Sequence, residues 1–551
     1  MRRIILLLIG FYVSTPSFSQ FRLNGVEPFY DKATKLFLFS ISEGLWGKEW
    51  IADVEICEDS NWETITIDGV AAGQGFVFKD IEGGKSYQIE ASTGEGTKAF
   101  RLQFTYLPIL HFESGLFGRE YVDDKAVVQA DGVLSEVMDV KVKWRGGTTN
   151  GEGKNKRNYK VKCLDGGGGK MNRTFFGLRS DNTWILDAGQ VDLFRVRNLI
   201  AAGLWQDFAT GPYYMDKEPK ALTATRGRVV EVFLNKQYQG IFSLCEPIDR
   251  KQMRLKKYSS DGTIHGGLWK ASGYGDATFW NIPDEYDSTK EKNDIWELKY
   301  PEIEDLCPSD YSTLWNAIMF TASSSDREFN EHVKDYFDMP VLTDYYLFAQ
   351  VTNGFDICGK NVYWAVYDKV TDKRLTLAMW DLDCTMGQNY RDNPLHPDYV
   401  GPTYPLLSPN RIFYQLVRLN TDNFNKKVEW RYAELREGVF ATDSLRQRYI
   451  DAFNMLEASG AAGREEQRWS YDSDISGLRL NFREELDYIC EWIGRRMEFL
   501  DGQFAYTPTA IPVADGSREP SGSSAYTLQG TKAPENYRGI VIRNGKLEIR
   551  R

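Results

Sequence analysis

The sequence has few of the residues that build zinc sites and disulfide frameworks. Its 551 residues include seven cysteines, which are scattered and form no Cys-x-x-Cys pair, and only four histidines without metal-binding spacing. Zinc sites and small disulfide-bonded domains need closely spaced ligands or a denser cysteine pattern. No Gly-x-Ser-x-Gly elbow is present either. The sequence therefore gives no support for a zinc protein, a disulfide scaffold or a serine hydrolase.

Positive charge is also in deficit. The chain has 67 Lys and Arg against 78 Asp and Glu, a formal net charge of −11. Affinity for nucleic acid comes mainly from neutralising phosphates, so a nucleic-acid partner is not expected. A site that handles phosphate in such an acidic protein needs a metal ion or a concentrated basic strip.

Long apolar runs are absent, and none approaches the roughly 20 residues that cross a bilayer. The longest run near the start, Ile4–Val13, follows two arginines and precedes a small-residue exit with Ser17 and Ser19. This order is typical of a secretory signal peptide, which we predict at residues 1–19. We therefore expect a secreted protein, in the periplasm or on the cell surface, that does not span the membrane.

Turn spacing and composition divide the remaining chain. Residues 20–107 contain short strands between Gly, Asp and Asn turns and predict a small β-sandwich-type domain. Residues 108–506 have strands first and helices later, which predicts an α+β domain with a helical C-terminal part. Residues 507–525 are rich in Pro, Gly, Ser and Ala and predict a linker, and residues 526–551 predict a small β tail.

The strongest chemical signal lies between residues 353 and 387. Asp356 and Asn361 are spaced D-x-x-x-x-N, and two strands are predicted at Val362–Tyr367 and Leu375–Trp380. The two arms of this β-hairpin are nearly equal in length. We therefore expect the end of the second arm to lie beside the start of the first.

Two aspartates, Asp381 and Asp383, follow the second arm directly. Their carboxylates share one face if extended geometry persists, because side chains alternate along a strand. With Asp356 and Asn361 they would gather oxygen ligands of the kind that Mg²⁺ or Mn²⁺ prefers. Asp and Asn also hydrogen-bond the backbone at strand ends, so a purely structural role is the alternative.

A basic stretch at residues 145–162 is the second candidate. It begins at Arg145 and ends in a strand on which Lys160 and Lys162 share one face. A strand lysine of this kind can grip phosphates, although the P-loop order is absent and a solvated hairpin is the simpler reading. Glu246, which follows an apolar strand, could pair with such a lysine or could be an ordinary strand-end carboxylate.

Four segments, in this order, resemble the CotH (spore coat protein H) kinase family over roughly residues 107–500. They are RGGTTNGEGKNKRNYKVK (145–162), FFGLRSDNTWILDAGQVDLFRVRNL (175–199), VEVFLNKQYQGIFSLCEPIDR (230–250), and DICGKNVYWAVY with LAMWDLDCTMG (356–387). The resemblance implies a divergent protein-kinase-like fold. It also implies transfer of the ATP γ-phosphoryl group, with Mg²⁺ or Mn²⁺, to Ser or Thr of an extracytoplasmic protein.

The resemblance also implies roles for single residues. Asp356 resembles the catalytic-loop aspartate, and Asn361 and Asp381 resemble metal ligands. Asp383 is the alternative to Asp381 in that role. Lys160 or Lys162, with Arg145 nearby, resembles the phosphate-binding site, and Glu246 resembles the ion-pair partner of the catalytic lysine.

Some features depart from ordinary kinases. Gly354-Phe355-Asp356 stands in place of His-Arg-Asp, Trp-Asp-Leu-Asp stands in place of Asp-Phe-Gly, and no Gly-x-Gly-x-x-Gly occurs. ATP is also scarce outside the cytoplasm. The alternative is therefore a kinase-fold surface protein that binds a partner or glycan without catalysis.

Residues 526–551 resemble the C-terminal sorting tails of Bacteroidetes proteins exported by the type IX system, or form a hairpin without that role.

Overall fold

The computed structural model describes most of the chain. The described residues are 19–147, 151, 153–302, 309–388, 410–470, 479–507, 526–527, 539–543 and 546–550. They form ten α-helices and several β-sheets, so the predicted α+β class is confirmed. The chain divides into two compact units, Met1–Phe504 and Ala505–Arg551. The predicted signal peptide lies almost wholly outside the described residues.

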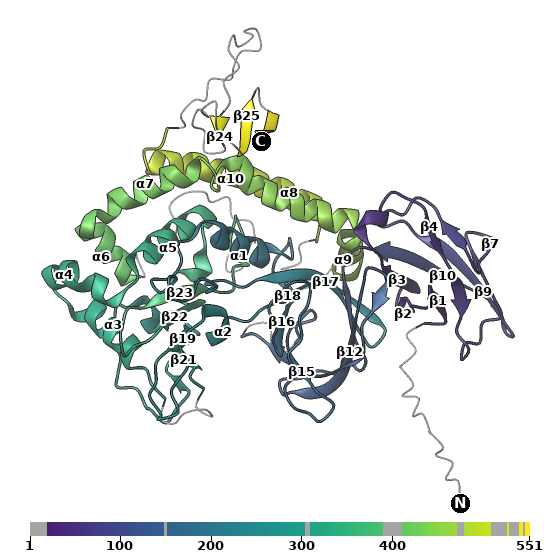
Figure 1. The fold of residues 1–551 in the computed structure, drawn as a ribbon, viewed down its shortest axis with the longest axis horizontal. Helices are drawn as coiled ribbons and strands as arrows, with labels where there is room; N and C mark the ends of the chain where they lie inside the picture. Colours follow the sequence, from purple (N-terminus) through teal and green to yellow (C-terminus); the bar gives the residue numbers. More distant parts are fainter. Residues whose placement is uncertain are drawn as a thin grey trace, which may run out of the picture. The chain divides into compact units, whose positions relative to one another are not determined.

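The first part of the large unit is built from the short strands predicted for residues 20–107. Six of them form a sheet in the order β2-β3-β10-β9-β6-β7, and β1-β5 and β4-β8 form two-stranded sheets (Figure 1). Their bounds are β1 (Phe21–Leu23), β2 (Phe29–Asp31), β3 (Leu36–Ser40), β4 (Trp50–Ala52), β5 (Val54–Ile56), β6 (Thr64–Ile67), β7 (Val70–Ala71), β8 (Phe76–Phe78), β9 (Tyr87–Thr93) and β10 (Gly96–Thr105). Tyr87, Ile89 and Ala91 of β9 alternate with exposed residues and face one apolar core, as the period of a strand requires.

The next strands close into a β-barrel. The sheet order is β11-β17-β18-β16-β15-β14-β12-β13, and β11 also pairs with β12, which joins the two sides of the sheet. The bounds are β11 (Ile109–Phe112), β12 (Val122–Ala130), β13 (Val133–Leu134), β14 (Met138–Arg145), β15 (Asn158–Leu164), β16 (Thr183–Asp187), β17 (Gly227–Leu234) and β18 (Gln237–Cys245).

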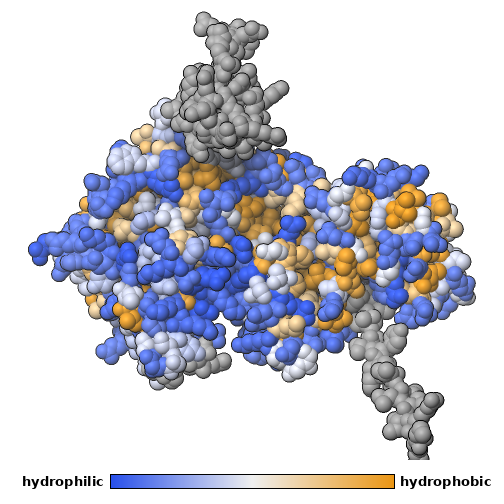
Figure 2. Space-filling model, in the orientation of Figure 1, coloured by the Kyte–Doolittle hydropathy of each residue, from blue (hydrophilic) through white to orange (hydrophobic). Residues whose placement is uncertain are grey.

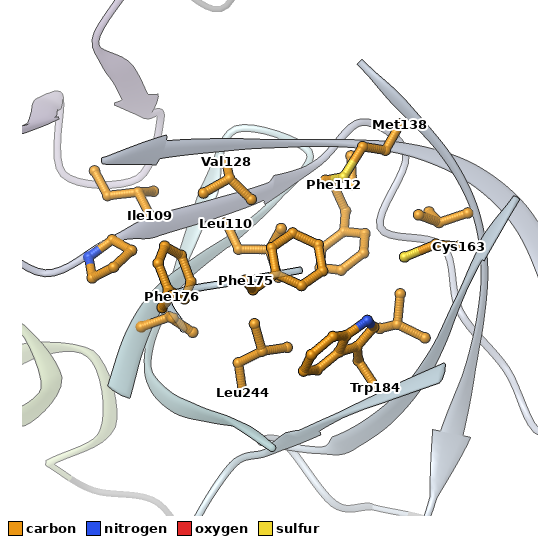
Figure 3. Close-up of a pocket in the computed structure, with 15 residues that line it drawn as sticks. Ile109, Leu110, Phe112, Val128, Met138, Cys163, Phe175, Phe176, Trp184 and Leu244 are labelled. Atoms are coloured by element: carbon orange, nitrogen blue, oxygen red, sulfur yellow. The ribbon is translucent and has the colours of Figure 1, made fainter. Parts of the chain in front are cut away.

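The barrel interior is apolar. It encloses a cavity of about 20 Å³, lined by side chains such as Leu110, Met138 and Trp184 and by Phe175 and Phe176 of the loop between β15 and β16 (Figure 3). This volume has room for about one water molecule, but the exposed lining is apolar and the N–H of Trp184 donates to the carbonyl of Asp181. The interior is therefore a packed core, and the chemistry of the barrel lies on its outer face.

A second sheet follows, in the order β20-β21-β19-β22-β23. Its strands are β19 (Gly267–Ala271), β20 (Lys292–Asn293), β21 (Trp296–Tyr300), β22 (Val362–Val366) and β23 (Thr376–Met379). Every residue of β22 and β23 is buried, which shows that this hairpin is covered on both faces. A buried hairpin holds the residues at its ends in fixed positions.

Helices make up the later part of the large unit, as predicted. They are α1 (Arg197–Phe208), α2 (Arg250–Met253), α3 (Ser312–Ser323), α4 (Asp326–Tyr336), α5 (Met339–Thr352), α6 (Arg411–Leu419), α7 (Phe424–Arg436), α8 (Thr442–Ala458), α9 (Ala461–Trp469) and α10 (Phe482–Gln503). Helices α8 and α10 pack side by side (Figure 1), and α9 packs on β18. None of the described helices has both the length and the apolar character needed to cross a bilayer.

The surface differs between the two ends of the large unit. The face over α4 is almost entirely hydrophilic, whereas apolar side chains lie exposed over the N-terminal strands (Figure 2). Ile51 is 65% exposed and Val70 is 60% exposed there.

The small unit contains β24 (Tyr526–Thr527), β25 (Gly539–Arg543) and β26 (Lys546–Arg550) in one antiparallel sheet, so the strands predicted for the tail are present.

Candidate functional site

The β22–β23 hairpin brings the two halves of the acidic motif together. Val362 pairs with Met379, and the backbone N–H of Trp380 donates to the carbonyl of Asn361 at 3.1 Å. Asp381 therefore directly follows the residue that is bonded to Asn361. The hairpin predicted from the sequence is confirmed, and it explains why residues twenty positions apart share one end of a sheet.

Asp356 lies at the centre of a small hydrogen-bond network in the 3₁₀ helix η4 (Phe355–Ile357). Its Oδ2 accepts from Nδ2 of Asn361 at 2.8 Å. Its Oδ1 accepts from Nζ of Lys360 at 2.9 Å and from the hydroxyl of Tyr274 at 3.3 Å. The carboxylate is buried, so these donors stabilise its charge and fix its orientation. Because Asn361 donates its amide N–H to Asp356, its Oδ1 is directed away from that carboxylate.

The backbone is left-handed at two of the three metal-ligand candidates. Asn361 has a φ of 60° and Asp381 a φ of 65°. Asn and Asp tolerate this region best among residues with a side chain, although it still costs about 1 kcal/mol or more. β23 ends at Met379 and Asp381 has a positive φ, so the condition for a shared face of Asp381 and Asp383, that extended geometry persists, is not met.

Negative charge is concentrated around Asp383. Burial raises the pKa of this carboxyl well above its usual value, and the nearby carboxylates of Asp381, Asp187, Asp356 and Asp192 raise it further. Like charges in a poorly solvated place disfavour ionisation of the last carboxyl. A divalent cation placed here would reverse that effect, because it would be the largest local charge.

Asp187, at the end of β16, is a member of this cluster that the sequence interpretation missed. Its Oδ2 accepts from Nδ2 of Asn198 at 2.6 Å, and Oδ1 of Asn198 accepts from the backbone N–H of Leu382 at 3.0 Å. Asn198 therefore ties the barrel to the Asp381–Asp383 segment. The signal that could have identified Asp187 was the same as for Asp381, an apolar strand that ends in aspartate.

The outer face of the barrel carries the predicted lysines. In the β14–β15 pair, Lys143 lies opposite Lys160 and Lys141 lies opposite Lys162, so the shared face of Lys160 and Lys162 is confirmed. Burial, and after it the nearby positive charges of Lys162 and other cations, lower the pKa of Lys160 to about 8. Such a cluster of cations favours a bound anion.

A second set of cations comes from the other sheet. Burial lowers the pKa of Lys270, on β19, to about 8, while the nearby Asp381 carboxylate opposes that shift and Arg145 and Lys299 add to it. The guanidinium of Arg145 lies 4.3 Å from the centre of the Trp380 ring. The barrel face and the second sheet therefore meet where the carboxylates lie. Lys270 follows no recognisable motif, and nothing in the sequence pointed to it.

Glu246 lies elsewhere than predicted. It is fully buried at the end of β18, where its Oε1 accepts from Nη2 of Arg226 at 2.8 Å and from the backbone N–H of Arg179 at 2.6 Å. Residues 227 and 245 pair across β17 and β18, which places Arg226 next to Glu246. The expected ion pair between Glu246 and Lys160 or Lys162 is therefore not formed among the described residues, because a neighbouring arginine takes that place.

A buried lysine–glutamate pair does form, between Lys156 within the basic stretch and Glu465. Oε1 of Glu465 accepts from Nζ of Lys156 at 2.5 Å and from Nε of Arg195 at 2.7 Å, and its Oε2 accepts from the backbone N–H of Ile241 at 2.7 Å. Gly240 makes room for this carboxylate, since a Cβ there would lie 1.8 Å from Oε2. Burial lowers the pKa of Lys156 to about 7. This pair anchors the Gly-rich segment to α9.

The carboxylates do not converge on a single point. Within the described ranges, no group of three or more His, Cys, Asp and Glu side chains is arranged to hold a metal ion. The oxygen donors of Asn361, Asp381 and Asp383 still match the chemistry of Mg²⁺ or Mn²⁺. No disulfide joins the six cysteines among the described residues.

These carboxylates, amides and cations belong to a mixed α+β protein with a barrel and a helical half. A family model described as CotH kinase protein matches residues 142–500, more than half of the chain. The chain therefore belongs to the CotH kinase protein family. The match includes every residue that the sequence analysis assigned to the site. No curated protein sequence matches the chain.

Proposed function

We propose that this chain is a secreted, metal-dependent phosphotransferase with a divergent kinase-like fold. It transfers the γ-phosphoryl group of ATP to a Ser or Thr hydroxyl of an extracytoplasmic protein. One observation carries the proposal: Asp356 accepts a hydrogen bond from Asn361 beside the acidic Asp381–Asp383 segment, where Arg145 of β14 lies against the Trp380 ring.

Phosphoryl transfer depends mainly on positioning and on charge neutralisation. In the proposed reaction, the acceptor oxygen bonds to the γ-phosphorus, the bond from that phosphorus to the β–γ bridging oxygen breaks, and ADP leaves. Asp356 orients the acceptor hydroxyl and takes its proton. The donors to Asp356, of which Lys360 is the closest cation, hold this carboxylate in place during that step.

The remaining charges bind the nucleotide. Asn361, Asp381 and Asp383 would hold Mg²⁺ or Mn²⁺, which supplies charge neutralisation to the phosphates when bound. Lys160 and Lys162 would contact the phosphates from the barrel, with Arg145 next to the carboxylates. The lowered pKa of Lys160 supports this role, because burial and nearby cations disfavour its charged form until an anion binds.

The test is a calorimetric titration of the protein from Gln20 onward with ATP, with and without Mn²⁺. The proposal predicts manganese-dependent binding that Asp381→Asn abolishes. Asp372→Asn is the matched control, because Asp372 lies in the turn of the same hairpin and pairs with Arg374. No binding of ATP by the folded wild-type protein with either metal contradicts the proposal.

A second candidate function is binding of a protein or glycan at the cell surface without catalysis. Two observations favour it: no described acidic group is arranged to hold a metal, and Asp356 is already held by several donors. The same titration separates the two functions, since a binding protein without catalysis needs no nucleotide. The proposed location is tested by fractionating cells and probing the periplasm and surface for the chain.

A further inference from the structure

An arginine and two aromatic side chains form a surface cluster next to the loop that carries Asp356. The rings of Trp280 and Tyr414 lie 5.3 Å apart, and the guanidinium of Arg411 lies 5.2 Å from the centre of the Trp280 ring. We refer to Trp280, Arg411 and Tyr414 as the Trp280 cluster. Its members come from two segments that are far apart in the sequence.

Both segments are fixed to the catalytic loop by hydrogen bonds. The hydroxyl of Tyr274 donates to Asp356 at 3.3 Å, and the short helix Gly275–Thr278 leads from there to Trp280. On the other side, Nδ2 of Asn410 donates to the carbonyl of Cys358 at 3.2 Å, and Arg411 is the next residue. The Trp280 cluster is therefore where these two segments meet beside the loop.

The guanidinium of Arg411 has N–H groups that its bonds to the described residues do not use. Its Nε donates to the carbonyl of Thr321 at 2.7 Å, and no carboxylate pairs with it among the described residues. Asp326, an acidic group on which Arg411 acts, is already paired with Arg418, with one N–O distance of 2.9 Å. Arg411 and Arg418 thus both act on the Asp326 carboxylate, and among the described residues it is Arg418 that pairs with it.

The exposure of the cluster suits contact with a partner. Tyr414 is 40% exposed, while Trp280 and Arg411 are half-buried. A guanidinium stacked on an indole is pre-organised and presents a planar fork that matches a carboxylate. Trp, Tyr and Arg are also the residues that most often dominate binding energy at protein interfaces.

We propose that the Trp280 cluster binds an acidic side chain of the acceptor protein, close to the Ser or Thr that receives the phosphoryl group. This inference rests on the proposed function, since it assigns a substrate class to the same site. Arg411 pairs with the carboxylate, and the rings of Trp280 and Tyr414 exclude water from that pair. The acceptor is thereby recognised as an acidic peptide segment.

The test measures peptide binding without nucleotide. Two synthetic peptides share a central serine, flanked by glutamates in one and by glutamines in the other, and fluorescence anisotropy gives their affinities. Wild-type protein binds the glutamate peptide more tightly. Arg411→Gln weakens that binding about tenfold and leaves the glutamine peptide unaffected, because a hydrogen-bonded charge pair is lost. Arg483→Gln, on α10 and paired with Glu457 away from the Trp280 cluster, is the control and changes neither affinity.

Arg411→Gln also alters the contact with Thr321, so Tyr414→Ala provides a second variant at an exposed position. It too weakens binding of the glutamate peptide. Equal binding of the two peptides by the wild type overturns the inference, as does a preference that both variants retain. Titration of Arg411→Gln with ATP and Mn²⁺ reports on the proposed function separately, and its result is unchanged from the wild type.

Discussion

At the scale of single residues, the cations of the barrel face have an unusual electrostatic environment. Burial and neighbouring positive charges bring the pKa of Lys160 to about 8. The charged form is the one that binds phosphate, so ATP affinity is expected to fall as the pH rises above 8. Lys160→Met is expected to weaken ATP binding about tenfold or more at pH 7, because a charged hydrogen bond is lost.

The measurement is the same calorimetric titration over a range of pH. Lys125→Met is the matched control, since Lys125 lies on β12 and pairs with Asp139 at the surface. An affinity that is unaffected by Lys160→Met would show that the phosphates bind elsewhere.

His111 contributes to stability through burial rather than chemistry. It stacks on Phe29, with ring centres 5.0 Å apart, between the N-terminal strands and the barrel. Burial lowers its pKa to about 4, whereas the unfolded value is about 6.5. The unfolded state therefore takes up the proton first, and stability falls as the pH drops from 6.5 towards 4.

Between pH 6.5 and 4 the wild type is expected to lose about 3 kcal/mol of unfolding free energy through His111, since the pKa difference of roughly 2.5 corresponds to ~1.36 kcal/mol for each unit. His111→Phe is expected to abolish this loss. Urea denaturation at several pH values measures it. His332→Phe, at an exposed position, is the control and should leave the slope unchanged. An identical slope for His111→Phe and the wild type would contradict the assignment.

At the scale of elements, the Lys156–Glu465 pair joins the basic segment to helix α9. Both side chains are fully buried, and Glu465 also accepts from Arg195. Removing one partner leaves buried charge without compensation, so Glu465→Gln is expected to cost about 3–5 kcal/mol of unfolding free energy. Denaturant unfolding measures this, with the exposed Glu457→Gln as control. A loss below about 1 kcal/mol would show that the pair is not an anchor.

The elements that local sequence patterns specify were predicted well. The β22–β23 hairpin and the shared face of Lys160 and Lys162 follow from short-range alternation, and both are confirmed. The left-handed Asp381 was not foreseen, because a backbone reversal after a strand leaves no mark on the apolar pattern.

The site residues that the sequence missed depend on contacts between distant segments. Asp187, Lys270 and Tyr274 reach the site only because the barrel, the second sheet and a loop come together there. The partner of Glu246 was mistaken for the same reason, since strand pairing rather than sequence spacing supplies Arg226. Pairwise contacts of this kind cannot be read from one sequence.

At the scale of the whole molecule, closure of the barrel is the feature least visible in the sequence. It requires β11 to pair with β12 on one side and with β17 on the other, and β17 begins more than a hundred residues later. The succession of strands and helices predicted the α+β class, but strand order in a sheet is set by long-range pairing.

The division into two compact units gives a prediction for the tail. Deleting the residues after Tyr506 is expected to leave the thermal unfolding midpoint of the large unit within about 2 °C, because the cores described lie before that point. Differential scanning calorimetry of the two forms checks this. A large drop in the midpoint would mean that the tail stabilises the large unit, whereas an unchanged midpoint with altered cellular location would support a sorting role.

The central claim is that Asp356 acts in phosphoryl transfer, and the most direct measurement is transfer of labelled γ-phosphate from ATP to protein in the presence of Mn²⁺. Extracytoplasmic proteins of the source cell serve as acceptors for the wild-type chain and for Asp356→Asn, with Asp372→Asn as control. The account predicts labelling of Ser or Thr by the wild type and the control. It also predicts a reduction of about 10²- to 10⁴-fold in Asp356→Asn, as expected for loss of a general base. Equal labelling by Asp356→Asn, or none by the wild-type protein when it binds ATP, would contradict it.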